Sequence, residues 1–189
     1  MELETKRQLV HMSGAAFPFY ILAVGLHLSV STFIFLLSAG LIISYGYKKG
    51  VRFPVISRIV DSTEREGVIE KFPGRGALSF FFGSLLVLLL FGSGMNVVCA
   101  SIIILALGDS FSTLIGKRYG RHKIFYNPDK SVEGSIGGFI PAFIGAGIFV
   151  SPGVALLGAL VGMAVESLSL KIDDNITIPV ISGFFMFLL

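Results

Sequence analysis

Long apolar runs separated by short polar links dominate the chain. A helix that crosses a bilayer needs roughly 17–25 mostly apolar residues, and slightly shorter helices occur in thin or protein-lined regions. Seven runs meet or approach this length: 12–27, 29–47, 77–92, 95–115, 135–150, 154–170 and 177–189. The pattern therefore predicts an all-α, polytopic integral membrane protein with about seven transmembrane helices, folded as a single membrane-embedded domain over residues 1–189.

Positive charge is confined to alternate links between these runs. All 15 Lys and Arg residues fall in four segments, which are 1–11, 48–76, 116–134 and 171–176. The other links carry no Lys, Arg, Asp or Glu and lie near 27–31, 92–96 and 151–153. Lys and Arg are enriched in cytosolic loops. The charge pattern thus predicts a cytosolic amino terminus and favours seven spans over six or eight.

The composition excludes several other classes of protein. The 189 residues are 53% hydrophobic and 14% charged, whereas soluble domains carry about 25% charged residues. A soluble globule and a disordered chain are both excluded on this ground. Cys99 is the single cysteine, so neither a disulfide framework nor a cysteine zinc site fits. The basic residues lie on short loops between apolar runs, so nucleic acid is not predicted as a partner.

Carboxylates lie at the inner ends of three apolar runs. Asp109 and Glu166 stand one to two turns inside their runs, where an ionisable group costs about 2.5–3.5 kcal/mol and usually faces partners or water. Asp173 and Asp174 precede Asn175 at the start of the last run. One of these caps the helix, but two adjacent acids exceed what capping requires. Because hard oxygen ligands suit Mg²⁺, these acids predict a metal site at one cytosolic cavity. The alternative is structural carboxylates paired with nearby Lys or Arg.

The segment 116–134 combines basic residues, glycines and a helix start. Glycine lets backbone amides approach an anion closely, and Lys and Arg neutralise the anion. The sequence Lys130-Ser131-Val132-Glu133-Gly134 then opens the fifth predicted helix, whose first turn offers N–H groups to a phosphate. With the nearby carboxylates, this predicts a magnesium–polyphosphate site. The alternative, an anchor for anionic headgroups, does not account for Glu133 or the glycine spacing.

A third polar motif precedes the first apolar run. Glu4, Arg7 and His11 recur at intervals of three and four residues, so they share one helix face. A functional face and a solvated juxtamembrane face both fit this spacing.

The motifs also occur in a recognisable order. In chain order they are Glu4-x-x-Arg7-x-x-x-His11, Gly108-Asp109, Gly116-Lys-x-x-Gly120, Lys130-Ser-x-Glu133-Gly134, Glu166 and Asp174-Asn175-x-x-x-Pro179. This order resembles the CTP-dependent dolichol kinase and phytol kinase family over nearly the whole chain. Gln8 departs from the family pattern, where a second basic residue is expected. The resemblance implies a kinase-like domain that transfers the γ-phosphoryl group of CTP to the hydroxyl of a membrane lipid alcohol, with Mg²⁺ or another divalent cation.

The resemblance also implies roles for individual residues. Asp109, Lys130 and Glu133 are the expected catalytic residues, and Glu133 either binds metal or orients the lipid hydroxyl. Asp109, with Asp174 or Glu166, is expected to hold the metal ion. The expected nucleotide-binding residues are Lys117, Arg118, Arg121, His122, Lys123, Lys130, Ser131 and Gly134. Further candidates are Arg7, His11, Asp173 and Asn175.

Other functions stay open at this point. Phosphatidate cytidylyltransferases are more distantly similar and would attack the α-phosphorus of CTP, although Asp174-Asn175-x-x-x-Pro179 favours the kinase. An ion-coupled transporter would place carboxylates near the midplane, whereas the ionisable groups here crowd one face. A protein–lipid scaffold leaves the loop and the carboxylates unexplained. The expected partners are CTP, a lipid alcohol and the bilayer, with the site on the cytosolic face of the cell membrane or endoplasmic reticulum. The alcohol and the oligomeric state are not specified by the sequence.

Overall fold

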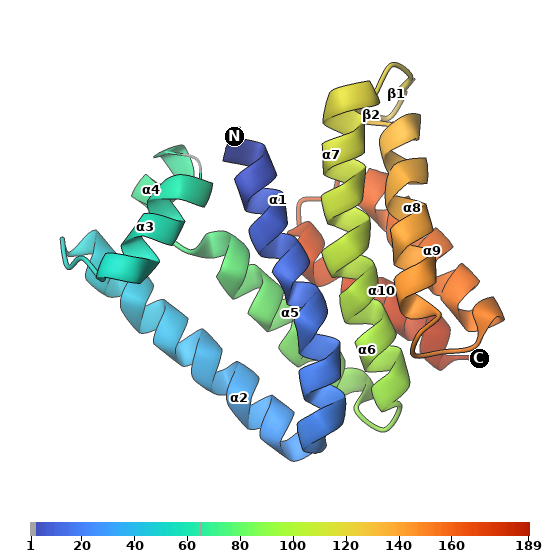
Figure 1. Ribbon diagram of the computed structural model, residues 1–189, viewed down its shortest axis with the longest axis horizontal. Coiled ribbons are helices and arrows are strands. Elements are labelled where there is room, and N and C mark those ends of the chain that lie inside the picture. The colour runs from blue at the N-terminus through green and yellow to red at the C-terminus, as the bar shows by residue number, and fades with distance from the viewer. Residues whose placement is uncertain (1–2, 65) are drawn as a thin grey trace.

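The computed structural model describes residues 3–64 and 66–189, which form a largely helical chain (Figure 1). Glu2 and Arg65, which the charge pattern places on the cytosolic side, lie outside the described residues. The elements in chain order are α1 (Leu3–Ser13), the 3₁₀ turn η1 (Gly14–Ala16), α2 (Phe17–Lys48), α3 (Pro54–Thr63), α4 (Glu66–Lys71), α5 (Arg75–Phe91), α6 (Met95–Ile103), the π-helix η2 (Ile104–Asp109), α7 (Ser110–Tyr119), β1 (Lys123–Ile124), β2 (Asn127–Ser131), α8 (Val132–Ala146), α9 (Pro152–Ser167) and α10 (Asp174–Phe187).

The chain reverses direction inside α2, at Gly25. This residue has φ 79° and ψ 176°, a backbone conformation that glycine adopts readily and other residues do not. The two arms on either side of Gly25 form a V in Figure 1. The first two predicted apolar runs are therefore joined by a sharp turn, slightly earlier than the link predicted near 27–31.

Two helical stretches of the described chain are long and apolar enough to cross a membrane, namely Leu3–Lys48 and Met95–Tyr119. Four shorter apolar helices accompany them, and these are α5, α8, α9 and α10. When Leu3–Lys48 is divided at Gly25, these helices coincide with the seven predicted apolar runs. Seven membrane crossings and a cytosolic amino terminus stay predictions.

The expectation of an all-α chain is wrong in one segment, because a short β-hairpin connects α7 to α8. Its strands β1 and β2 are antiparallel, with Lys123 opposite Ser131 and Ile124 opposite Asn127. The helix α7 ends at Tyr119, and the backbone of the next residue, Gly120, is extended. Pro128 also cannot supply the N–H that a continuing helix needs. The hairpin extends beyond the ends of both helices (Figure 1).

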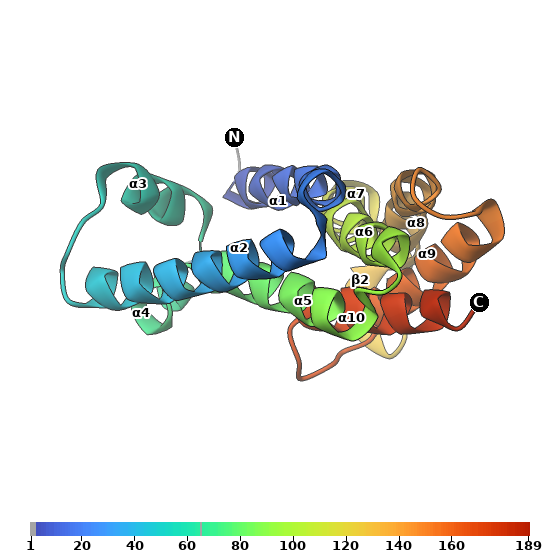
Figure 2. The same ribbon diagram turned by 90° about the horizontal axis from the view of Figure 1, so that it is seen from below.

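The helices α7 and α8 lie side by side in both views (Figures 1 and 2). A Cβ atom added to Gly134 would lie 3.0 Å from Cα of Gly116 and 2.8 Å from the carbonyl oxygen of Ser112. Glycine is thus required here for close approach of two helices. The close contact brings the end of α7 and the start of α8 to one end of the molecule.

The buried apolar core lies where α5, α6, η2, α8, α9 and α10 pack together. Its fully buried members include Val87, Ile102, Leu105, Ala142 and Ala159. This packing fixes the ends of the helices that carry polar side chains. The carboxyl ends of η2 and α9 and the amino ends of α8 and α10 therefore face a common region.

Candidate active site

Two cavities meet in this region and share Arg7, Thr113 and Lys130. The first, which we call the basic cavity, has a volume of about 620 Å³ and is lined by α1, α7, β1, β2, the start of α8 and the end of α9. The second, which we call the mixed cavity, has a volume of about 590 Å³. Its lining includes residues of α1, the start of α2, α3, α5, the end of η2, β2 and the start of α10. Lys130 and Arg7 thus lie at the junction of two compartments with different linings.

Lys130 is held at this junction by carboxylates. Its ammonium group contacts Glu166, whose side chain is 1% exposed, and lies 3.7 Å from Oδ2 of Asp174. Glu166 also accepts a hydrogen bond of 2.6 Å from the Ser112 hydroxyl. Burial lowers the pKa of Lys130, but the surrounding carboxylates outweigh it, so that its pKa lies above the ordinary value. The carboxylates around Lys130 therefore favour its charged form at the junction of the two cavities.

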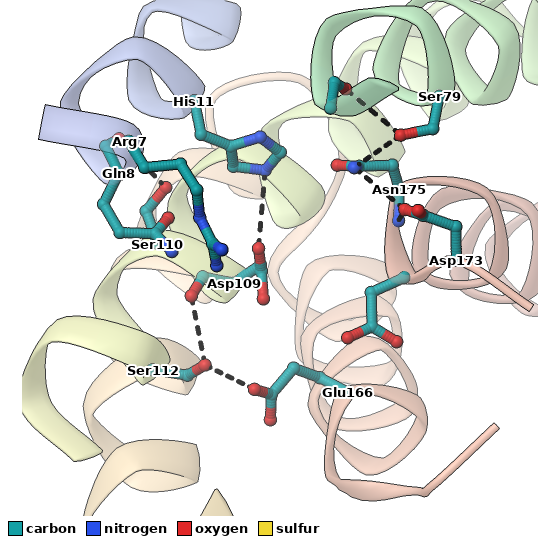
Figure 3. A network of polar contacts seen from close by, with 12 residues as sticks. Arg7, Gln8, His11, Ser79, Asp109, Ser110, Ser112, Glu166, Asp173 and Asn175 are labelled. Carbon is teal, nitrogen blue, oxygen red and sulfur yellow. Dashed lines mark hydrogen bonds and ion pairs between the residues drawn. The ribbon is translucent and has the colours of Figure 1, made fainter. Parts of the chain in front are cut away.

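Asp109 is the last residue of η2 and lies beside His11. The carboxylate Oδ2 of Asp109 is 3.7 Å from Nε2 of His11. Figure 3 shows Arg7 and His11, both on α1, pointing toward Asp109, whereas Glu166 on α9 points toward Ser112. Single π-helical turns are rare and often occur at functional sites. The position of Asp109 on such a turn fits its predicted functional role.

The two acids at the start of α10 differ in their contacts. Asp173 caps the helix, since it accepts a 3.2 Å hydrogen bond from the backbone N–H of Asn175. It also pairs with Arg75 at 3.3 Å. Burial raises the pKa of Asp174 to about 6, although the charge of Lys130 opposes this. The prediction that one of the pair is a cap is confirmed, and Asp174 is the acid next to Lys130.

The three predicted metal ligands do not converge on one point. In the described chain, no group of three or more His, Cys, Asp and Glu side chains has the arrangement of a metal site. Glu166 and Asp174 both face Lys130, whereas Asp109 faces His11. A closed cage formed by protein ligands alone is therefore not present among the described residues.

Glu133 braces the hairpin. Its carboxylate contacts Nδ1 of His122 at 2.6 Å and accepts hydrogen bonds from the backbone N–H groups of Arg121 and His122. The hydrogen bond from the His122 side chain is the main cause that lowers the pKa of Glu133 to about 2. Glu133 lines neither cavity. The structure thus separates Glu133 from the residues with which a catalytic role was expected.

The predicted phosphate cradle at the start of α8 already has internal partners. The N–H of Val132 donates to the carbonyl of His122 at 3.0 Å, and the N–H of Gly134 donates to the Ser131 hydroxyl at 3.1 Å. The N–H of Glu133 bonds its own carboxylate. Anion binding here therefore depends on side-chain charge more than on free amides.

Five of the eight predicted nucleotide-binding residues line the basic cavity, and these are Lys117, Lys123, Lys130, Ser131 and Gly134. The other three lie outside both cavities, and these are Arg118, Arg121 and His122. Of the further candidates, Arg7 lines both cavities, and His11, Asp173 and Asn175 line the mixed one.

One residue of the site is missing from the predicted set. Glu4 contacts Arg7 at 2.7 Å and Lys117 at 2.5 Å, so it joins two cations from different helices. The spacing of Glu4 and Arg7 on one helix face is visible in the sequence. The contact with Lys117 is not, because 113 residues separate the two.

A comparison with known families places this arrangement in context. The sequence profile described as the cytidylyltransferase family matches residues 5–172. This chain belongs to that family. The match covers Arg7, Asp109, Lys130 and Glu166, and it ends just before Asp173. No solved structure matches the chain.

Individual relatives come from widely separated organisms. An uncharacterized protein of Methanocaldococcus jannaschii is 32% identical over 187 residues, covering 96% of this chain and 91% of that protein. Phytol kinase 1 of Arabidopsis thaliana is 29% identical over 147 residues, covering 65% of this chain and 46% of that protein. CTP-dependent diacylglycerol kinase 1 of Schizosaccharomyces pombe is 24% identical over 151 residues, covering 70% of this chain and 67% of that protein.

The chain therefore spans about half the length of the plant kinase that it matches. The resemblance inferred from the motifs, to lipid-alcohol kinases and more distantly to cytidylyltransferases, is confirmed by these matches. The two cations at the junction of the cavities, Arg7 and Lys130, are therefore the candidates for binding a nucleotide phosphate.

Proposed function

We propose that this protein is a CTP-dependent kinase that transfers the γ-phosphoryl group of CTP to the hydroxyl of an isoprenoid-type lipid alcohol. The observation that carries the proposal is the meeting of the basic cavity and the mixed cavity at Lys130. Phosphoryl transfer needs mainly positioning and charge neutralisation, and a charged donor and an apolar acceptor need different compartments. The names of the phytol kinase and the diacylglycerol kinase that match the chain support the same activity.

In this proposal the triphosphate occupies the basic cavity. Arg7, Lys117, Lys123 and Lys130 line that cavity and supply positive charge from separate elements. Lys130 lies where the two cavities meet, so its charge would lie closest to the transferred γ-phosphoryl group. The alcohol oxygen forms a bond to the γ-phosphorus as the bond to the bridging oxygen breaks. CDP leaves with the electron pair of that bond, and the hydroxyl proton is released.

Mg²⁺ belongs to this proposal, and the residues present fit it. Mg²⁺ is usually held by one or two carboxylates together with the phosphates of the substrate, so a closed protein cage is not required. Asp109 and Asp174 line the mixed cavity beside Lys130, and the buried Oε2 of Glu166 has no hydrogen-bond partner among the described residues. Asp109, with Asp174 or Glu166, would hold the ion together with the phosphates, and the ion when bound would neutralise charge on the phosphates.

A membrane location is also part of the proposal. Large apolar side chains face outward along α2 and α8, and Phe35, Ile42 and Ile144 are 68%, 70% and 63% exposed. Exposed apolar surface of this extent is costly in water and typical of contact with lipid or partners. The turn at Gly25 and the link between α5 and α6 lie at the end of the molecule away from the hairpin (Figure 1). Seven crossings with the amino terminus and the site on the cytosolic side fit this arrangement.

The test supplies the purified protein, in lipid vesicles, with CTP labelled at the γ- or the α-phosphorus. The acceptors are phytol, geranylgeraniol, dolichol, diacylglycerol and phosphatidate. Transfer of γ-label to an alcohol is the expected result, and its loss on chelation with EDTA and recovery with Mg²⁺ tests the metal. Transfer of α-label to phosphatidate would instead establish a cytidylyltransferase, the alternative that the family description favours. Transfer of neither label overturns both.

A further inference from the structure

His11 presents an unpaired nitrogen to the mixed cavity. Its side chain projects from α1 toward Asp109 (Figure 3), and its ring packs edge-on against Phe80 with centroids 5.4 Å apart. The ring makes a hydrogen bond to the backbone of Leu105. Nε2 is buried and has no hydrogen-bond partner among the described residues, and Oδ2 of Asp109 at 3.7 Å is too distant to be one.

These contacts define which nitrogen is available. Because Nε2 has no partner, the bond to the Leu105 carbonyl is made by Nδ1–H. In the neutral ring, Nε2 is then an acceptor with a free lone pair. A buried polar atom without a hydrogen-bond partner has an unfavourable desolvation free energy. A ligand group that donates a hydrogen bond to Nε2 is therefore stabilised there. A hydroxyl is such a donor.

The rest of the mixed cavity fits the chain attached to such a hydroxyl. Part of its lining is apolar and is formed by side chains of α3 and α5 and the start of α2, which are Ile59, Val60, Phe80, Phe81 and Phe17. Its polar lining includes Asp109, Lys130 and Asp174, and further polar side chains come from α1, α3 and α5, among them Arg7, Thr63 and Arg75. This mixture of apolar side chains and charged groups fits an amphiphile with one polar head and an apolar chain.

We propose that the mixed cavity binds the acceptor alcohol and that Nε2 of His11 accepts the hydrogen bond of its hydroxyl. This inference rests on the proposed function. It places the hydroxyl oxygen beside Asp109 and at the junction with the basic cavity, where the γ-phosphoryl group would lie. Glu133, the other candidate for orienting the hydroxyl, is bonded to His122 and lines neither cavity.

The experiment compares His11→Phe, which keeps a ring against Phe80 but removes the acceptor, with His11→Gln, whose amide oxygen restores an acceptor near Nε2. His27→Phe is the matched control, because His27 lines neither cavity. We expect His11→Phe to slow alcohol phosphorylation at saturating substrates about 100-fold, the scale of a positioned proton acceptor. His11→Gln should be at least tenfold faster than His11→Phe. The affinity for CTP should change less than twofold in both variants.

An unchanged kcat in His11→Phe, or an equal loss of CTP affinity, would overturn the inference. Binding of radiolabelled geranylgeraniol without CTP separates this inference from the proposed function. Wild-type protein that binds the alcohol through His11 but transfers no phosphoryl group refutes the kinase and leaves the alcohol site standing. Wild-type protein that binds no alcohol refutes the site. If His11→Phe does not fold, Val60→Trp is tested instead, because the larger side chain fills the apolar part of the cavity. This variant should raise KM for the alcohol at least fivefold and leave KM for CTP unchanged. An unchanged KM for the alcohol would refute the site.

Discussion

The ammonium group of Lys130 contacts the buried carboxylate of Glu166, which lies 36 residues later in the chain. This contact ties the hairpin strand β2 to the end of α9. It also supplies the countercharge for an acid that is 1% exposed. The same lysine therefore serves the stability of the fold and, in our proposal, the binding of the nucleotide.

Replacing Lys130 by Met should separate these two contributions. The variant removes the partner of the buried Glu166 carboxylate. Breaking a buried ion pair in this way lowers the free energy of unfolding by about 3–5 kcal/mol. The double variant Lys130→Met/Glu166→Gln should recover most of that stability, since the neutral amide can still accept from Ser112. Neither variant should bind CTP with wild-type affinity. Thermal unfolding and CTP titration measure the two effects, and unchanged CTP binding by the double variant would count against the lysine as a nucleotide ligand.

Asp109→Asn is expected to abolish transfer while the protein stays folded. The contact of Asp109 with His11 is 3.7 Å long, so the amide disturbs no short hydrogen bond between these two side chains, but it removes the charge proposed for metal binding. Phosphoryl transfer should fall at least about 100-fold, as expected when charge neutralisation at the transferred group is lost, and the unfolding temperature should stay within a few degrees. An active variant would refute the metal role of Asp109.

Much of the helical fold could be predicted because apolar runs of this length have few stable alternatives. The grouping of Asp109, Lys130 and Asp174 at one cavity follows from the same pattern and from the placement of charge. The pattern predicts a link between the first two apolar runs near 27–31, whereas the turn lies at Gly25. The hairpin could not be predicted because β1 has only two residues, too few for any periodicity. Its pairing is fixed by the close approach of α7 and α8.

The details of the site depend on contacts that the sequence does not encode locally. Glu133 belongs to a motif with Lys130, and this neighbourhood suggests a shared role. The structure turns Glu133 toward His122 and Lys130 toward Glu166. Likewise, the spacing of Gly116 and Gly134 favours an anion-binding role, but the packing of α7 against α8 already requires glycine at position 134.

Glu133→Gln tests whether this residue is catalytic or braces the hairpin. The amide oxygen can still accept from the backbone N–H groups of Arg121 and His122, but the charged contact with the His122 ring is lost. We expect KM for CTP to rise severalfold with kcat nearly unchanged. Steady-state kinetics distinguishes the two roles, since a turnover rate that drops by about two orders of magnitude, the scale of general acid–base catalysis, would restore the catalytic role predicted from the motif.

Glu4→Gln should weaken CTP binding without slowing the transfer step. Glu4 contacts both Arg7 and Lys117, which line the basic cavity from two helices. Without the carboxylate these cations lose their common partner, so KM for CTP should rise about three- to tenfold. The turnover rate and the KM for the alcohol should stay near wild type. Lys6→Gln on the same helix is the control, because Lys6 lines neither cavity.

A double-variant cycle then decides how Glu4 acts. If Glu4 works by positioning Lys117, the effects of Glu4→Gln and Lys117→Met on CTP affinity should be less than additive, because each removes the same contact. Additive effects would mean that the 2.5 Å contact between the two does not contribute to binding. A parallel rise in KM for the alcohol would indicate displacement of the whole of α1, since Arg7 and His11 on that helix also line the mixed cavity.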